Sequence, residues 1–466
     1  MRQIRELYNI MAVALRNILN GTKERDFERL RNIEPSYERS IIENIKRIIP
    51  QLFDMDTLNV AELSERQLRD GFLVGKLAHC VASTKDMTIL IYLVKHLDIY
   101  LEDSVYRCIP IDQDIWRFES LNDNFRECGL RLLPRLACNW EHKNRDAYHS
   151  YTMLFYMKNF YYVNSKEEEE YIVEHILLPQ TTFYHALKRG ELCVCVSPVT
   201  GENVVQVTEK YTRDNEELIA VEPLVPEVEQ RLQEQILSVL EKAALQKADI
   251  LLLPELLGST GIRVSIQLEL EKRQRIPDNE FPKLTVCPSA WEERRNSCAV
   301  LDDMGELLFE QQKHYGADLK KWGAKEDIVS DKKIYILHCK GVGRVAIAIC
   351  KDFLMTSYLE ILIETLKVNL LLVPSFTTGD YQFKTCSDKY GYQDCDVVWV
   401  NTCASRWSNS QGQMTTAVTR AYLPGKWGNS RLKAYMEELC DKQYKCDGTC
   451  LYTYGIRLEE EEHYEI

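Results

Sequence analysis

The chain has 466 residues, of which 45% are hydrophobic, enough for two or three domains with cores of their own. Its formal net charge of −13 argues against broad nonspecific binding of nucleic acid, although a local basic groove stays open as an alternative. No stretch reaches the roughly 18 to 20 uninterrupted apolar residues of a membrane-spanning helix. These features predict a globular protein that is not embedded in a membrane.

The first residues, Met1-Arg-Gln-Ile-Arg-Glu6, lack the apolar core of a signal peptide, so we expect a cytoplasmic protein. In that compartment its 16 cysteines are expected to be free thiols and not a disulfide framework. The repeated Cys-x-x-Cys spacing of a structural zinc site is missing from two cysteine groups, Cys440/Cys446/Cys450 and Cys193/Cys195. A Gly-rich phosphate loop of the Walker type is also missing. We therefore expect no metal and no cofactor.

The chain is predicted to be mainly α-helical to about residue 185. Apolar residues recur at helical spacing over residues 4–18 and 41–49. The apolar run 88–95 predicts a central buried helix, with a buried strand as the alternative. The recurrence Leu130/Leu133/Leu136 is also helix-like, but Pro134 is expected to break or kink a helix there.

We assign residues 1–190 to this helical domain and residues 191–466 to a second domain. The helical part carries no recognisable chemistry, so its expected role is to bind a protein partner or to gate the second domain. A purely structural extension is the alternative. Between the two parts a β-hairpin is predicted, because Glu191–Val196 and Asn203–Thr208 flank the turn-forming residues Ser197–Glu202.

Three reactive side chains follow strand-like segments of the second part. Glu255 closes the apolar run that begins at Ile250, Lys313 follows another such segment, and Cys350 ends the run that begins at Val345. A thiol with a pKa near 8.5 is mostly protonated at neutral pH, so it needs a base or a positive field. Glu255 is the expected base. Lys313, helped by a backbone N–H just after Cys350, is expected to stabilise charge on a carbonyl or nitrile.

Each of these residues also has a plainer interpretation. Most cysteines are inert packed thiols, and Glu255 is also placed to face the dipole of a following helix. Lys313 taken alone would be assigned to the surface. The neighbouring His314 raises a Cys–His pair as another option, without a supporting motif. The order of Glu, Lys and Cys along the chain favours the catalytic interpretation.

This ordered set resembles the nitrilase superfamily of carbon–nitrogen hydrolases, whose triad is Glu, Lys and Cys. The resemblance covers roughly residues 217–430. Asp352 matches the acidic residue that the family places two positions after its nucleophile. The other matching segments are Glu217–Val221 as the opening strand, Val228–Lys247 as the first helix, and Asn296–Leu301, Leu370–Ser375 and Val397–Asn401 as later strands. The resemblance implies an α/β fold, an α-β-β-α sandwich preceded by the mainly helical domain.

The sequence departs from the family pattern in two places. Lys351 stands where the family usually has an aromatic residue, which implies a charged substrate side of the pocket. Tyr390–Asp394 stands in place of the family's Arg-Ala-x-Glu-Asn stretch. This replacement weakens the expectation that the chain has the family's standard dimer surface and substrate wall. The family often has a second Glu that assists the triad, and the resemblance assigns that role to Glu326.

The resemblance therefore implies a carbon–nitrogen hydrolase that cleaves a small-molecule amide or nitrile through a Cys thioester. The expected catalytic residues are Glu255, Lys313, Cys350 and Glu326. Acyl transfer to an amine requires the same residues. The rival hypothesis is a noncatalytic scaffold or binding protein in a larger assembly, with bacterial defence systems as one setting in which nitrilase-like domains occur. The family also implies a homo-oligomer.

Overall fold

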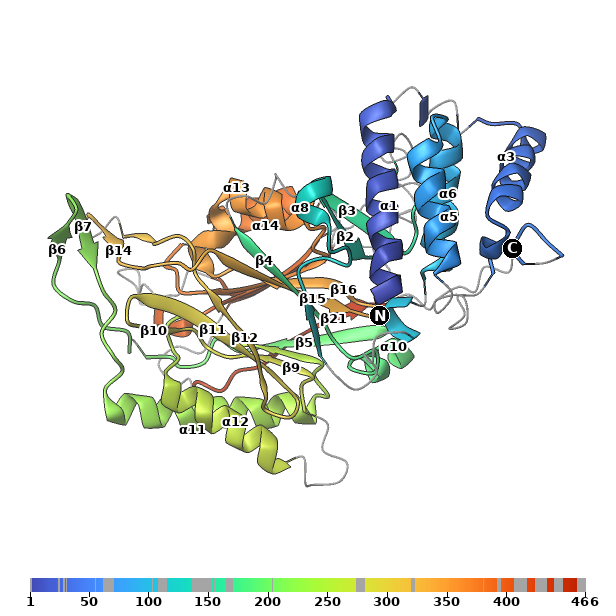
Figure 1. The fold of residues 1–466 in the computed structure, drawn as a ribbon. Coiled ribbons are helices and arrows are strands. Elements are labelled where there is room, and N and C mark those ends of the chain that lie inside the picture. The colour runs from blue at the N-terminus through green and yellow to red at the C-terminus, as the bar shows by residue number, and fades with distance from the viewer. Residues whose placement is uncertain are drawn as a thin grey trace. The chain divides into compact units, whose positions relative to one another are not determined.

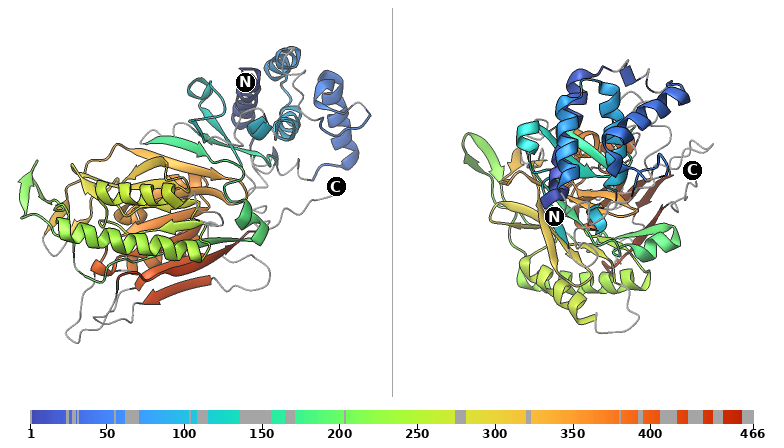
Figure 2. Two further views of the ribbon diagram at one scale, coloured as in Figure 1. Left: turned by 90° about the horizontal axis from the view of Figure 1, so that it is seen from below. Right: turned by 45° about the vertical axis from the view of Figure 1, so that its right-hand side comes forward.

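Two compact units make up the structure of the chain, which is a computed structural model (Figures 1 and 2). The first comprises Met1–Glu170, Glu174–Thr181 and His338–Gly343, and the second comprises Tyr171–Val173, Thr182–Leu337 and Arg344–Ile466. The structure describes residues 2–23, 26–27, 30, 32–54, 56–61, 71–102, 104–107, 115–135, 153, 156–164, 171–202, 204–273, 281–319, 323–379, 381–391, 395–405, 417–423, 434–439 and 447–458.

Helices dominate the first unit. The longer ones are α1 (Arg2–Gly21), α3 (Pro35–Ile48), α5 (Phe72–Ser83) and α6 (Met87–Tyr100). α1 packs against α5 and α6 (Figure 1), and its apolar residues at helical spacing are buried: Ile4, Leu7, Met11, Leu15 and Ile18. The side chain of Asp86 caps α6 by accepting from the Thr88 N–H at 2.9 Å. The run 88–95 is therefore a buried helix and not a strand. None of the helices among the described residues is long and apolar enough to cross a membrane.

The first unit also contains strands and short helices. β1 pairs antiparallel with β4, and β2 pairs antiparallel with β3. The strands are β1 (Trp116–Phe118), β2 (Leu130–Pro134), β3 (Phe160–Asn164) and β4 (Ile172–Leu177). The short helices are η1 (Pro50–Leu52), α7 (Ser104–Arg107) and α8 (Phe125–Cys128).

The region predicted to be mainly helical, which extends to about residue 185, is therefore too long. Leu130 and Leu133 belong to a strand, and Leu136 lies outside the described residues. Pro134 explains the difference, because proline is tolerated at the end of a strand but lacks the N–H that a helix interior requires.

One sheet of the second unit has the strand order β10-β11-β9-β8-β5-β21, with β12 also paired to β11. Its central strands β5, β8 and β9 are parallel. Their apolar residues are buried, as expected for parallel strands that are covered on both faces. The strands are β5 (Glu191–Val196), β8 (Ile250–Leu252), β9 (Leu284–Val286), β10 (Ala290–Glu292), β11 (Arg295–Asp302), β12 (Leu307–Gln312) and β21 (Tyr452–Arg457).

A second sheet contains β15-β16-β17-β18-β19-β20 in this order. β16, β17 and β18 are parallel, whereas β19 and β20 continue the sheet in antiparallel pairs. The strands are β15 (Lys333–Cys339), β16 (Gly343–Ile347), β17 (Leu370–Ser375), β18 (Asp396–Asn401), β19 (Ala417–Leu423) and β20 (Ala434–Leu439).

Helices cover the outer faces of the two sheets (Figure 1). α11 (Pro226–Leu245) and α12 (Thr260–Arg273) share a hydrophobic core with the first sheet. α13 (Thr356–Leu359), the π-helical turn η6 (Glu360–Thr365) and α14 (Tyr381–Gly391) lie over the second sheet. There Phe383 of α14 packs against Trp399 of β18, with 5.4 Å between ring centroids. The predicted α-β-β-α sandwich is confirmed.

Two predictions about the start of this sandwich are wrong. Glu191–Val196 pairs with β8 and β21, and so forms the opening strand of the first sheet instead of one arm of a hairpin with residues 203–208. The predicted opening strand, Glu217–Val221, overlaps β7 (Glu216–Ile219). β7 belongs to a small separate sheet with β6 (Tyr211–Arg213), β13 (Asp318–Leu319) and β14 (Ala324–Glu326). A short apolar run can form either kind of strand, so composition alone does not decide between them.

Candidate active site

Glu255 lies just beyond β8 and is buried, with 1% of its surface exposed. Its Oε1 atom accepts from Lys313 Nζ at 2.7 Å and from Asn296 Nδ2 at 2.9 Å. Its Oε2 atom accepts from the backbone N–H of Phe376 at 2.8 Å. A carboxylate held by this many donors has a fixed orientation, which a general base requires.

Lys313 follows β12 and places its ammonium between two carboxylates. Nζ lies 2.7 Å from Glu255 Oε1 and 2.6 Å from Glu326 Oε2. Glu326, at the end of β14, also accepts from the Ala317 N–H at 3.0 Å and from Asn296 Nδ2 at 3.0 Å. Glu326 thus enters the cluster from the small sheet of β6, β7, β13 and β14, and Lys313 enters it from the end of the β11–β12 pair.

Cys350 is the first residue of the 3-10 turn η5 (Cys350–Leu354), which follows β16. Its φ of 48° lies in the left-handed region, which costs energy for a residue with a Cβ and is most often tolerated at functional positions. Its Sγ lies 3.9 Å from the carbonyl oxygen of Phe376, whose N–H binds Glu255. The backbone of one residue in the loop after β17 therefore contacts both the thiol, through its C=O, and the carboxylate, through its N–H.

The charges of this cluster act on one another through a medium that contains little water. Burial raises the pKa of Glu255, and the Lys313 ammonium opposes that effect. Burial alone would lower the pKa of Lys313, but the two carboxylates outweigh it and raise that pKa well above its ordinary value. Burial, followed by the charge of Glu255, raises the pKa of Cys350. The resting cysteine is therefore a neutral thiol beside a carboxylate, and its reaction requires removal of the proton.

Asp352 joins the segment after Cys350 to the segment after Lys313. Its carboxylate accepts from the His314 N–H at 3.0 Å and from the Tyr315 N–H at 2.9 Å. Burial raises the pKa of Asp352 to about 8, against the opposing effect of these N–H donors. The acidic residue two positions after Cys350 thus holds the segment after Lys313 against the segment after Cys350.

The structure brings Glu255, Lys313, Glu326 and Cys350 together in one buried cluster. The Cys–His alternative receives no support, because the ring nitrogens of His314 contact Ser330 Oγ at 2.6 Å and Gln311 Nε2 at 3.2 Å. Burial also lowers the pKa of His314 to about 4, which makes it a poor base at neutral pH.

Sequence reasoning missed two residues of the cluster. Asn296 was part of a predicted strand, but its amide bridges both carboxylates. An asparagine just before the apolar run Cys298–Leu301 of a predicted strand was the available signal. Phe376 contributes only backbone atoms, for which the side-chain sequence gives no signal.

A pocket of about 340 Å³ opens beside this cluster. Glu326 belongs both to its wall and to the buried cluster. Lys351 lines the same pocket, and its Nζ lies 2.8 Å from Asp318 Oδ2. Other residues in the wall are Arg213, Tyr315 and Lys325.

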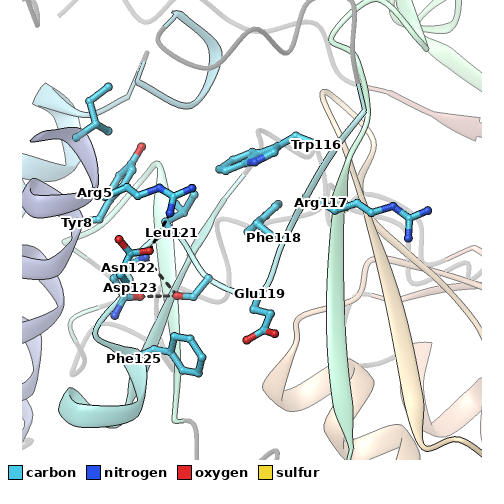
Figure 3. A pocket seen from close by; sticks show the side chains of 12 residues that line it. Arg5, Tyr8, Trp116, Arg117, Phe118, Glu119, Leu121, Asn122, Asp123 and Phe125 are labelled. Atoms are coloured by element: carbon cyan, nitrogen blue, oxygen red, sulfur yellow. Dashed lines mark hydrogen bonds and ion pairs between the residues drawn. The ribbon is translucent and has the colours of Figure 1, made fainter. Parts of the chain in front are cut away.

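The first unit has a different pocket, of about 240 Å³ (Figure 3). Trp116 and Phe118 stack there with 4.6 Å between ring centroids, and Arg5 pairs with Asp123 at 3.1 Å. None of the predicted site residues lines it. Within the described part of the chain, no group of three or more His, Cys, Asp or Glu side chains is arranged to hold a metal ion. Cys440 and Cys446 lie outside that part.

No family model matches this sequence, and none of the curated proteins compared with it matches either. Solved structures similar to it include a mutant of the amidase from Nesterenkonia sp. AN1 in complex with butyramide, at 15% identity and a TM-score of 0.38 over 58% of this chain and 92% of that one. Another structure of an amidase from Nesterenkonia sp. has 15% identity and a TM-score of 0.37 over 58% and 90%. A further mutant of that amidase, described as from the nitrilase superfamily, has 14% identity and a TM-score of 0.36 over 57% and 90%. Such distant similarity assigns no activity to this chain.

Proposed function

We propose that the protein is a carbon–nitrogen hydrolase that acts on an amide or nitrile through a thioester on Cys350. The observation that carries this proposal is the buried cluster in which Lys313 lies between Glu255 and Glu326, while the backbone of Phe376 contacts both Glu255 and Cys350. Two buried carboxylates and an ammonium are a poor way to stabilise a protein core, because the cost of desolvating buried charges can exceed the Coulombic gain.

For an amide, the reaction begins when Glu255 takes the proton from Cys350 Sγ. The sulfur attacks the carbonyl carbon, and Lys313 stabilises the negative charge that develops on the oxygen. The C–N bond breaks as Glu255 returns the proton to the leaving nitrogen, so that ammonia or an amine departs and a thioester remains. Water then attacks the thioester with Glu255 as base, which releases the acid and restores the thiol.

Turnover of simple amides tests this proposal. The purified protein is incubated with short aliphatic amides, butyramide among them, and with the matching nitriles, while ammonia release is followed and the intact mass is measured. We expect ammonia release and an acyl adduct on Cys350, both lost in Cys350→Ala. Glu255→Gln and Lys313→Met are expected to lower turnover by about 10²-fold or more, as for loss of a base or of an electrostatic stabiliser.

The second candidate is a noncatalytic binding or scaffold protein. It is favoured by the 6% exposure of Cys350, which leaves the thiol little access to a substrate in this conformation. A Cys350→Ala protein that keeps full biological activity would support the scaffold. Product analysis with amine acceptors separates hydrolysis from acyl transfer. The cytoplasmic location, the homo-oligomer and the partner of the N-terminal part stay predictions.

A further inference from the structure

Lys351 is the charged residue closest in sequence to the proposed nucleophile that also lines the pocket. Its side chain is 27% exposed, whereas that of its partner Asp318 is 60% exposed. Asp318 belongs to the two-residue strand β13, while Lys351 lies in the η5 turn that Asp352 ties to the segment after Lys313. Lys351 is thus the better anchored member of the pair.

The other charges in the pocket wall are held by the protein. Glu326 is bound by Lys313, and Asp327 is bound by Arg213 and Arg294 with its own side chain only 1% exposed. The remaining pair, Lys325 with Glu216, has a separation of 4.0 Å and side chains that are 46% and 61% exposed. Lys351 is therefore the pocket cation that follows Cys350 directly in the chain, and it is better shielded from water than Lys325.

Displacing Asp318 from Lys351 costs little, because a solvent-exposed ion pair adds little to stability. A ligand carboxylate in the same place would accept a charge-assisted hydrogen bond from a lysine that is already ordered and partly shielded from water. The geometry thus favours exchange of one carboxylate for another at the Lys351 ammonium.

We propose that the pocket selects an amide that carries a carboxylate, and that Lys351 determines this specificity by binding the carboxylate in place of Asp318. The inference rests on the proposed hydrolase function for its reaction, but the binding step does not depend on turnover. The substrate class is an ω-carboxylated primary amide, in which the amide reaches Cys350 and the carboxylate reaches the pocket.

Binding to the Cys350→Ala protein tests the inference without turnover. The affinities of succinamate, neutral succinamide and cationic 4-aminobutanamide are measured by calorimetry, and glutaramate is compared with glutaramide as a longer pair. We expect a carboxylate to bind at least tenfold more tightly than its neutral counterpart at one chain length, which is about 1.4 kcal/mol. In the same background, Lys351→Met should remove that preference.

Asp318→Asn separates this inference from a merely structural role of the ion pair. Because it frees the Lys351 ammonium, the substitution should tighten binding of the carboxylated amide, whereas a structural role predicts no gain. Lys325→Met is the matched control for general positive potential and should change the preference less than Lys351→Met. The inference would be overturned if carboxylated and neutral amides bind with equal affinity, if the cationic amide binds more tightly, or if none of the amides binds. It would also be overturned if Lys325→Met changes the preference as much as Lys351→Met does.

Turnover distinguishes the two proposals. If carboxylated amides bind selectively but the protein with Cys350 releases no ammonia, the hydrolase proposal fails and the pocket assignment stands. If neutral and cationic amides are hydrolysed as fast as carboxylated ones, the hydrolase stands and the specificity assignment fails.

Discussion

The backbone N–H of Lys313 donates to the carbonyl oxygen of Asn296 at 2.7 Å, and the side chains of these two residues meet the same two carboxylates. The β11–β12 pair therefore positions an amide and an ammonium together. Because each group offers hydrogens to both Glu255 and Glu326, the separation of the two carboxylates is fixed by a pair of neighbouring strands.

Replacing Asn296 by Leu should lower both activity and stability. The substitution keeps a similar volume but removes a donor from each carboxylate, and losing hydrogen bonds to buried charged groups costs about 1–3 kcal/mol. The melting temperature and kcat on an amide substrate measure the two effects. Asn296→Asp serves as the comparison, because a third buried carboxylate should harm the protein more at pH 8 than at pH 5. An Asn296→Leu protein with unchanged kcat would remove Asn296 from the site.

Lys313→Met should destabilise the second unit in a pH-dependent way. It leaves Glu255 and Glu326 buried without their cation, a change that costs about 3–5 kcal/mol for buried ion pairs. Without Lys313, burial raises the pKa of Glu255 unopposed, so its folded pKa exceeds its unfolded pKa and stability falls as pH rises. Calorimetry should show a larger drop in melting temperature at pH 8 than at pH 5.

The double variant Lys313→Met/Glu326→Gln is the control for that prediction. Neutralising Glu326 removes one uncompensated charge, so part of the lost melting temperature should return at pH 8. A drop that is the same at both pH values would show that lost packing, and not charge, causes the destabilisation.

Asp352 is expected to make the wild-type protein less stable as pH rises. Its folded pKa is raised to about 8, above the value of about 3.9 for an unfolded aspartate, so the stability it contributes is fully present below the unfolded pKa and is lost as pH increases through about 8. Asp352→Asn removes this titration. The melting temperature of the wild type relative to Asp352→Asn should therefore fall between pH 5 and pH 9, and a constant difference would contradict the prediction.

Alkylation of Cys350 should accelerate at a lower pH in Glu255→Gln than in the wild type. Burial and the Glu255 charge both raise the pKa of this thiol, and the substitution removes the second cause. Amide turnover should fall in the same variant, because the base is lost. Iodoacetamide labelling from pH 6 to pH 10, with mass mapping, measures the shift. Cys339 is the control, since burial alone raises its pKa and Glu255→Gln should leave it unchanged.

The sequence allowed prediction of the sandwich and of four residues that the structure groups in the buried cluster, but not of Asn296 and Phe376 in the same cluster. Glu255, Lys313 and Cys350 each stand just after a strand, and each follows a segment that the sequence predicts to be a strand. Glu326 came from the family resemblance alone. It reaches the cluster through the separate sheet formed by β6, β7, β13 and β14, whose pairing no local pattern predicts.

The start of the sandwich was predicted incorrectly for a physical reason. Glu191–Val196 is apolar and lies near turn-forming residues, so it fits a hairpin as well as a buried strand. Its partners are β8, which follows it after two short strands and the helix α11, and β21, which begins at Tyr452. Pairing over such distances depends on the whole fold and leaves no trace in a short window of sequence.

The pairing of β5 with β21 also constrains the order of folding. Cys193 and Gly455 are partners in this pair, so an edge of the first sheet stays open until nearly all of the second unit has left the ribosome. An open strand edge is a template for pairing with other chains. Synthesis of this unit therefore passes through a long interval in which the exposed edge of β5 must be kept from other nascent chains, and slower translation lengthens that interval.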